Sequence, residues 1–79
     1  MRHVAQAPAH YEVELHQDAQ AGTAWRAIRR VGPDGTMQPR RFASLQAAHA
    51  HAERLRPKET RIVAVERDGW RRAVDATEA

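Results

Sequence analysis

Two glycine turns, one on each side of a helical stripe, constrain the fold of this chain most strongly. The segment "GPDG" at residues 32–35 combines a proline, which presets φ, with an Asp-Gly pair, so the chain is expected to reverse there. Asp68-Gly69 is a second turn signal, typical of a two-residue β-hairpin. Between the turns, apolar residues recur at helical spacing: Leu45, Ala48, Ala52 and Leu55. The sequence therefore predicts a hairpin, a helix and a second hairpin.

The bounds of the helix follow from signals at its two ends. Ser44 is a typical helix N-cap, because its hydroxyl can accept from the free amides of the first turn. Pro57 disfavours helical backbone in the residue before it. We therefore predict one helix, over residues 44–56.

The segment before the first turn predicts two strands. "YEVELH" at residues 11–16 alternates apolar and polar residues, which predicts Tyr11, Val13 and Leu15 inward and Glu12, Glu14 and His16 outward. Residues 17–24 are polar and show no periodicity, so a mobile loop is expected there. "WRAIRRV" at residues 25–31 is the second strand. Its apolar residues do not alternate strictly, which a bulge or burial on both faces would explain.

Three further strands complete the expected sheet. "TMQPRRF" contains Pro39, which cannot donate to a ladder, so this strand is placed at an edge or is interrupted. "RIVAVER" has four consecutive apolar residues, as in a strand covered on both faces, and "WRRAV" returns beside it. The predicted fold is α+β, with a single antiparallel sheet, one helix packed on one face, and the order β-β-β-α-β-β.

Size and composition limit what this fold can hold. A chain of 79 residues buries only about 60% of its unfolded surface, so the core is small and a ligand cavity is costly. The chain has no cysteine, which excludes disulfides and thiolate chemistry. We predict one domain at residues 10–75 with flexible tails at 1–9 and 76–79. No apolar run has the length of a membrane span or secretory signal, so a cytoplasmic protein without membrane contact is expected.

The basic charge is concentrated in the middle of the chain. The whole chain has a net charge of +3, but residues 26–72 hold 12 basic side chains against five acidic ones. Lys58 is the one lysine among them. Arginine forks onto phosphate or stacks on bases, so a nucleic acid is one interpretation. The other is that these arginines form ordinary solvated faces.

No pattern of residues indicates an enzyme or a cofactor. His49 and His51 lie two positions apart on the predicted helix, whereas two metal ligands on one helix face need a spacing of three or four. His49 borders the apolar stripe and is expected to be packed, and His51 is expected to face solvent. Ser44 is better explained as a cap than as a nucleophile, and "GPDG" lacks the lysine of a phosphate loop. We therefore predict a non-catalytic protein with no metal, no cofactor and no small-molecule substrate.

Two resemblances cover parts of the chain. In its order of Trp25, "FAS" at 42–44, an alanine-bearing helix, the apolar residues 62–65 and Asp68-Gly69, the chain is similar to small bacterial domains of unknown function. Residues 25–55 also resemble the arm-type, sheet-based DNA-binding domains at the N-termini of phage integrases. That resemblance implies that arginines of the hairpin lie on the face that enters the major groove. The chain departs from it by adding residues 61–74 after the helix.

Two binding functions follow as hypotheses. In the first, the sheet is a platform for a protein partner or for self-association, with Trp25 and Trp70 as interface anchors. In the second, a basic hairpin contacts the phosphate backbone of a nucleic acid. Glu12 and Glu14 on the outer face of the first strand would oppose phosphate binding there. The second hypothesis uses Arg26, Arg29, Arg30, Arg40, Arg41, Arg71 and Arg72.

Overall fold

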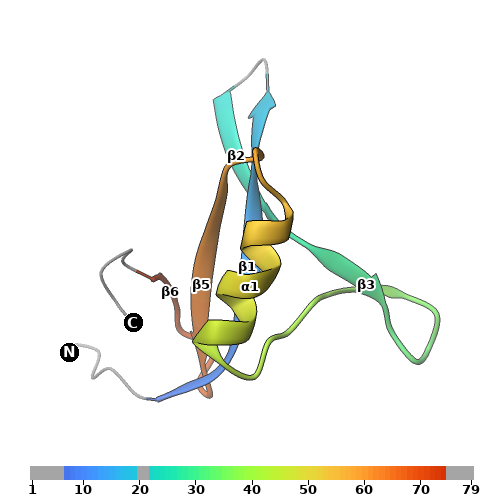
Figure 1. Cartoon of the computed structure of the whole chain (residues 1–79). Coiled ribbons are helices and arrows are strands. Elements are labelled where there is room, and N and C mark those ends of the chain that lie inside the picture. The colour runs from blue at the N-terminus through green and yellow to red at the C-terminus, as the bar shows by residue number, and fades with distance from the viewer. Residues whose placement is uncertain (1–6, 20–21, 75–79) are drawn as a thin grey trace.

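The longest strand, β1 (Pro8–Ala19), lies inside the main sheet of the computed structural model, which describes residues 7–19 and 22–74. The main sheet has the strand order β2-β1-β5-β6, all neighbours antiparallel, with β2 (Gly22–Ala27), β5 (Thr60–Glu66) and β6 (Arg71–Ala73). A second, two-stranded sheet is formed by β3 (Arg29–Val31) and β4 (Met37–Pro39), and α1 (Leu45–Arg54) is the helix. The fold is α+β with one helix packed on the sheet, as predicted (Figure 1). The described strands form two sheets instead of the predicted single one, and four strands precede the helix instead of three.

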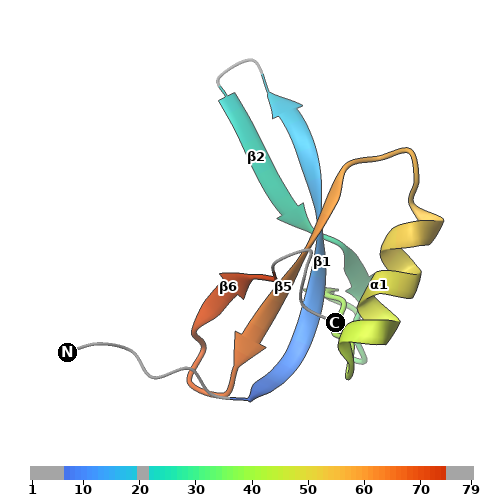
Figure 2. The ribbon, with the colours of Figure 1, turned by 60° about the vertical axis from the view of Figure 1, so that its left-hand side comes forward.

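The segment expected to be a loop between the first two strands is a β-hairpin instead. β1 extends to Ala19 and β2 starts at Gly22, with Gln17 opposite Ala24 in the register. The prediction of a mobile loop over residues 17–24 is therefore wrong for the described residues of that segment. This end of the hairpin extends beyond α1 (Figure 2). Without a core to face, it has no reason to alternate apolar and polar residues, so the strand signal is missing.

The predicted second strand is divided at Ile28. Trp25 and Ala27 lie opposite His16 and Glu14 of β1, whereas Ile28 packs against the hydrophobic core. The chain then leaves the main sheet, and β3 pairs only with β4 among the described residues. Residues 29–41, here called the arm, project away from the main sheet (Figure 1). Pro39 ends β4 at the edge of this small sheet, as its missing N–H predicts.

The helix covers one face of the main sheet and closes the core (Figure 2). Its N-cap is Ser44, whose Oγ accepts from the Ala47 N–H at 3.1 Å, so the predicted cap is confirmed. The helix ends at Arg54, within two residues of the predicted bound. The buried centre of the core consists of Val13, Phe42, Ala48 and Ile62. The predicted stripe of Leu45, Ala48, Ala52 and Leu55 packs into this core.

Strand β5 is covered on both faces, as its continuous apolar run predicts. Residues 62–65 are all buried, with Ile62 in the core under the helix. The turn to β6 passes through Gly69, whose φ of 88° lies in the left-handed region that glycine adopts readily. The predicted second hairpin is therefore present.

The predicted tails are only partly tested. Pro8 and Ala9 belong to β1, so the N-terminal tail predicted over residues 1–9 is too long. Residues 1–6 and 75–79 lie outside the described residues, and the predicted tail at 76–79 falls there. Within the described part of the chain, α1 is too short and too polar to cross a bilayer.

Candidate functional site

The arm is fixed at its base by backbone hydrogen bonds to β1. The Ile28 N–H donates to the Val13 carbonyl at 2.9 Å, and the Arg40 N–H donates to the Ile28 carbonyl at 2.7 Å. Phe42 exchanges two hydrogen bonds of 2.8 Å with Tyr11, and the Phe42 ring lies in the core. The chain therefore enters and leaves the arm at residues that the main sheet holds.

The tip of the arm is a tight, internally bonded turn. The Gly32 N–H donates to the Thr36 carbonyl at 2.7 Å, and Gly35 has a φ of 84°. Asp34 Oδ1 accepts from the Thr36 hydroxyl at 2.7 Å and from the Thr36 N–H at 3.1 Å. These hydrogen bonds hold the pKa of the Asp34 carboxyl below its ordinary value, and the bond from the Thr36 hydroxyl has the larger effect. The single acid of the arm is therefore used in its own turn.

One face of the arm exposes an apolar pair. Val31 lies directly opposite Met37 in the register, with Arg29 opposite Pro39 on the same face. Val31 is 60% exposed and Met37 is 54% exposed, which makes them two of the three most exposed large apolar residues described. The other face carries Arg30, opposite Gln38. The arm thus combines an open apolar spot with arginines on both of its faces.

The structure brings four of the seven candidate arginines together on the arm. All four are exposed, and within the described part of the chain none forms an ion pair: Arg29, Arg30, Arg40 and Arg41. Arg40 lies over the Phe42 ring, with its Cζ 5.3 Å from the ring centroid. With Asp34 as the only acid, the arm has four positive charges and one negative charge, a net +3.

The other three candidate arginines lie elsewhere. Arg26 is exposed on β2, opposite Leu15. Arg72 is half-buried on β6, opposite Ala64, and has interactions of its own. Arg71 is engaged in a salt-bridge network on the face of the sheet away from the helix, at 2.9 Å from Glu12. A single surface formed by all seven arginines is therefore absent from the structure.

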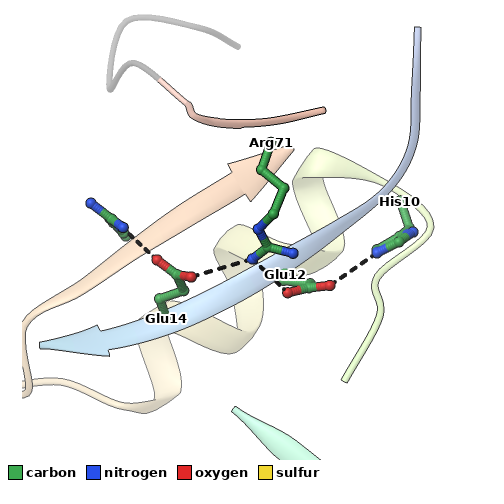
Figure 3. A network of polar contacts seen from close by, with 5 residues as sticks. His10, Glu12, Glu14 and Arg71 are labelled. Atoms are coloured by element: carbon green, nitrogen blue, oxygen red, sulfur yellow. Dashed lines mark hydrogen bonds and ion pairs between the residues drawn. The ribbon is translucent and has the colours of Figure 1, made fainter. Parts of the chain in front are cut away.

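That network explains why the predicted exposure of Glu12 and Glu14 is wrong. Both point away from the helix, but they are only 4% and 8% exposed. Arg71 Nη2 donates to Glu12 Oε1 at 2.9 Å and to Glu14 Oε2 at 3.3 Å, so one guanidinium bridges both carboxylates (Figure 3). Arg61 Nε donates to Glu14 Oε1 at 2.6 Å. The carboxylates neutralise arginines of β5 and β6 instead of facing solvent.

The hydrogen bonds of this network favour the charged forms of Glu12 and Arg71. Burial raises the pKa of the Glu12 carboxyl, but hydrogen bonds from Arg71 and from His10, at 3.1 Å, outweigh burial and leave the pKa below its ordinary value. The hydrogen bond to Glu12 raises the pKa of Arg71 in turn. The charges compensate each other within the fold, which indicates a structural role for this face.

The two tryptophans differ in their surroundings. Trp25 is half-buried between His16, whose ring centroid is 4.9 Å away, and the Arg61 guanidinium, 4.5 Å from the Trp25 ring centroid. Trp70 is 49% exposed, and its backbone N–H donates to Asp68 Oδ1 at 2.9 Å. The proposed anchors therefore do not share one surface patch: Trp25 belongs to the charged face, and Trp70 to the β5–β6 turn.

The helix histidines are placed opposite to the prediction. His49 is exposed, whereas His51 is half-buried with its ring centroid 5.2 Å from that of Phe42. Burial, with the charges of Arg40 and Arg54, lowers the pKa of His51. Within residues 7–19 and 22–74, no three His, Asp or Glu side chains are placed to share a metal ion.

A groove of about 480 Å³ runs between the second half of α1 and β5. Two of its cationic residues are already paired, Arg56 with Glu53 at 3.2 Å and Arg61 with Glu14. Its floor includes Ala52, Ile62 and Val74, which also pack on the core. The arm, whose four arginines form no ion pair with any residue that the structure describes, is the stronger candidate for a binding site.

Comparison of the chain with protein-family models, with curated proteins and with solved structures finds no match. The site is therefore defined by its geometry. Sequence reasoning found the arginines of the hairpin, but it missed the exposed Val31–Met37 pair and the buried carboxylates. Glu12 and Glu14 are two residues apart and so share one face of a strand. Pairing them with arginines of neighbouring strands would have indicated the salt-bridge network from the sequence.

Proposed function

We propose that this protein is a non-catalytic binding module that docks on a partner protein through its arm. The proposal rests on the Val31–Met37 pair, which a hydrogen-bonded arm presents to solvent at 60% and 54% exposure. Covering such a pair removes apolar surface from water, which favours association. The neighbouring arginines support the same role, because arginine is enriched at protein interfaces.

Paired affinity capture tests this function. The wild-type protein and a Val31→Ser/Met37→Ser variant are immobilised and exposed to nuclease-treated lysate of the source organism. Bound proteins are then identified by mass spectrometry. The matched control is Ala47→Ser/Ala50→Ser, on the exposed side of α1. We expect a protein retained by the wild type and the control but lost from the arm variant. Identical captures by all three proteins would contradict a docking role for the arm.

A nucleic acid is the second candidate partner, supported by the four arginines on the arm. A two-stranded ribbon fits the major groove, and arginines on both of its faces suit a groove with a phosphate wall on each side. If each arginine contacts one phosphate, the logarithm of the binding constant falls with the logarithm of salt concentration at a slope of about −3.6 for duplex DNA and about −2.8 for a single strand. Fluorescence anisotropy with labelled duplex DNA and single-stranded RNA measures this slope. A slope near zero, or no binding at low salt, would count against this candidate.

A further inference from the structure

We propose that the free edge of β3 binds an extended, acidic segment of the partner protein as an added β-strand. This inference rests on the proposed docking function of the arm and specifies how docking occurs. It follows from which backbone groups of the arm are already bonded, from the position of Pro39, and from the charge around the edge.

The register decides which backbone groups point outward. The Gly32 N–H bonds to Thr36, and the Arg40 N–H bonds to Ile28. In an antiparallel ladder, bonded and non-bonded pairs alternate. The pair between these two, Arg30 and Gln38, is therefore bonded inward. The N–H and C=O groups of the residues on either side of Arg30 point toward the outer edge of β3.

The two edges of the arm differ in their capacity to accept a strand. On the β3 edge, Arg29 and Val31 offer both an N–H and a carbonyl, and no other described strand occupies that edge. On the β4 edge, Met37 offers both groups but Pro39 has no N–H to offer. Strand addition needs repeated donor and acceptor groups, so the β3 edge is the competent one.

The side chains beside this edge select an acidic partner. Arg29 and Val31 face one side of the ribbon and Arg30 faces the other. An added strand would place acidic side chains next to the arginines and an apolar one against Val31, since directly opposed pairs lie within contact distance. A second arm would bring net charges of +3 together, which opposes self-association at this edge. Glu12 and Glu14 are buried in salt bridges and so do not offer a complementary surface.

Titration of the ¹⁵N-labelled protein with a synthetic heptapeptide tests the inference by NMR. The centre of the peptide is Val-Glu-Glu between threonines, so that antiparallel pairing places the valine opposite Val31 and the two glutamates opposite Arg30 and Arg29. We expect the largest amide shifts, and new protection from hydrogen exchange, at Arg29 and Val31. Arg30, whose amide already bonds inward, is expected to change much less. The same peptide with lysine in place of glutamate is expected to produce no shifts, because its charge repels the arm.

Two proline variants isolate the edge. Val31→Pro removes an outward N–H from β3, and Met37→Pro removes one from β4. Each variant also removes one side chain of the Val31–Met37 pair, so the two variants are matched in their loss of apolar surface. We expect Val31→Pro to reduce peptide affinity at least tenfold and Met37→Pro to reduce it less than threefold. The amide spectrum of each variant away from the arm shows whether the fold is intact.

Several outcomes would overturn the inference. Equal losses in the two proline variants would place docking on the apolar face, without strand pairing. Protection of Arg29 and Val31 in the peptide-free protein, with dimer-like line widths, would make a second copy the occupant. Shifts with duplex DNA but not with the peptide would make the partner a nucleic acid. A different result would contradict the proposed function itself: the same proteins captured from lysate by the wild type and by Val31→Ser/Met37→Ser.

Discussion

The Arg71 guanidinium in β6 donates to the Glu12 carboxylate in β1, 59 positions earlier in the chain and on the other side of β5. The same group reaches Glu14 at 3.3 Å. One side chain of β6 thus bridges two buried carboxylates of β1, and Arg61 also pairs with Glu14.

Replacing Arg71 with alanine should destabilise the fold, because Glu12 and Glu14 would stay buried without their shared partner. Removing one partner of a fully buried pair costs about 3–5 kcal/mol. The Arg71 side chain is 43% exposed, so solvent screens part of this interaction and we expect a loss of about 1–3 kcal/mol. Urea denaturation measures the change. Arg67→Ala, in the exposed β5–β6 turn, is the matched control and should change the free energy of unfolding by less than about 0.5 kcal/mol.

The stability of the protein should fall on the acid side because of Glu12. Its pKa in the folded state is lower than the ordinary 4.5, since the hydrogen bonds from Arg71 and His10 outweigh the raising effect of burial. The contribution to stability is therefore complete above pH 4.5 and is lost as the pH falls through the lower, folded-state value. Thermal melts from neutral pH into this range should show the fall, and Glu12→Gln should flatten it. An unchanged slope in that variant would assign the effect to other carboxylates.

Loss of the helix cap should weaken the fold by a small and specific amount. Ser44 Oγ accepts from the Ala47 N–H at 3.1 Å, so Ser44→Ala leaves that amide without its partner. We expect a loss of about 1 kcal/mol in the free energy of unfolding. Ser44→Asp should retain most of the stability, because aspartate is also a strong N-cap. Equal losses in both variants would show that the hydroxyl contributes through something other than capping.

The two described glycines of the arm turn should differ in their tolerance of alanine. Gly35 has a φ of 84°, so Gly35→Ala should strain the turn by about 1 kcal/mol and broaden the NMR signals of the arm. Gly32 has no such conformation, and the three atoms nearest to a Cβ placed there belong to the end of the Gln38 side chain, the closest at 2.7 Å. That side chain is exposed and can move aside, so Gly32→Ala should be tolerated. The rate of hydrogen exchange at the Arg30 amide measures the difference, and we expect faster exchange in Gly35→Ala than in Gly32→Ala.

Features with local causes were predictable from the sequence. The Asp68-Gly69 turn, the cap at Ser44 and the edge position of Pro39 each depend on the conformational preference of one or two residues. The covered strand at residues 62–65 was predictable because its apolar run leaves no face for solvent. The fold class follows from these elements.

Features that depend on distant partners were not predictable in the same way. The alternation of residues 11–16 gave the correct two faces, but burial of Glu12 depends on Arg71, which folds back from the far end of the chain. The division of the predicted second strand at Ile28 was indicated only by the irregular alternation of apolar residues in 25–31. The sequence did not indicate that Val31 and Met37 are exposed on an arm. The same two residues would also suit strands of a single sheet.

The place of β1 between β2 and β5 has a consequence for synthesis of the chain. β1, the arm and α1 are all made before β5, which pairs along the second edge of β1 and brings Ile62 against Val13. Until residues 60–74 leave the ribosome, β1 keeps an open edge, and Glu12 and Glu14 keep their hydration shells. This sheet is therefore expected to form only after residues 60–74 have been made, as one unit closed by the β5–β6 hairpin.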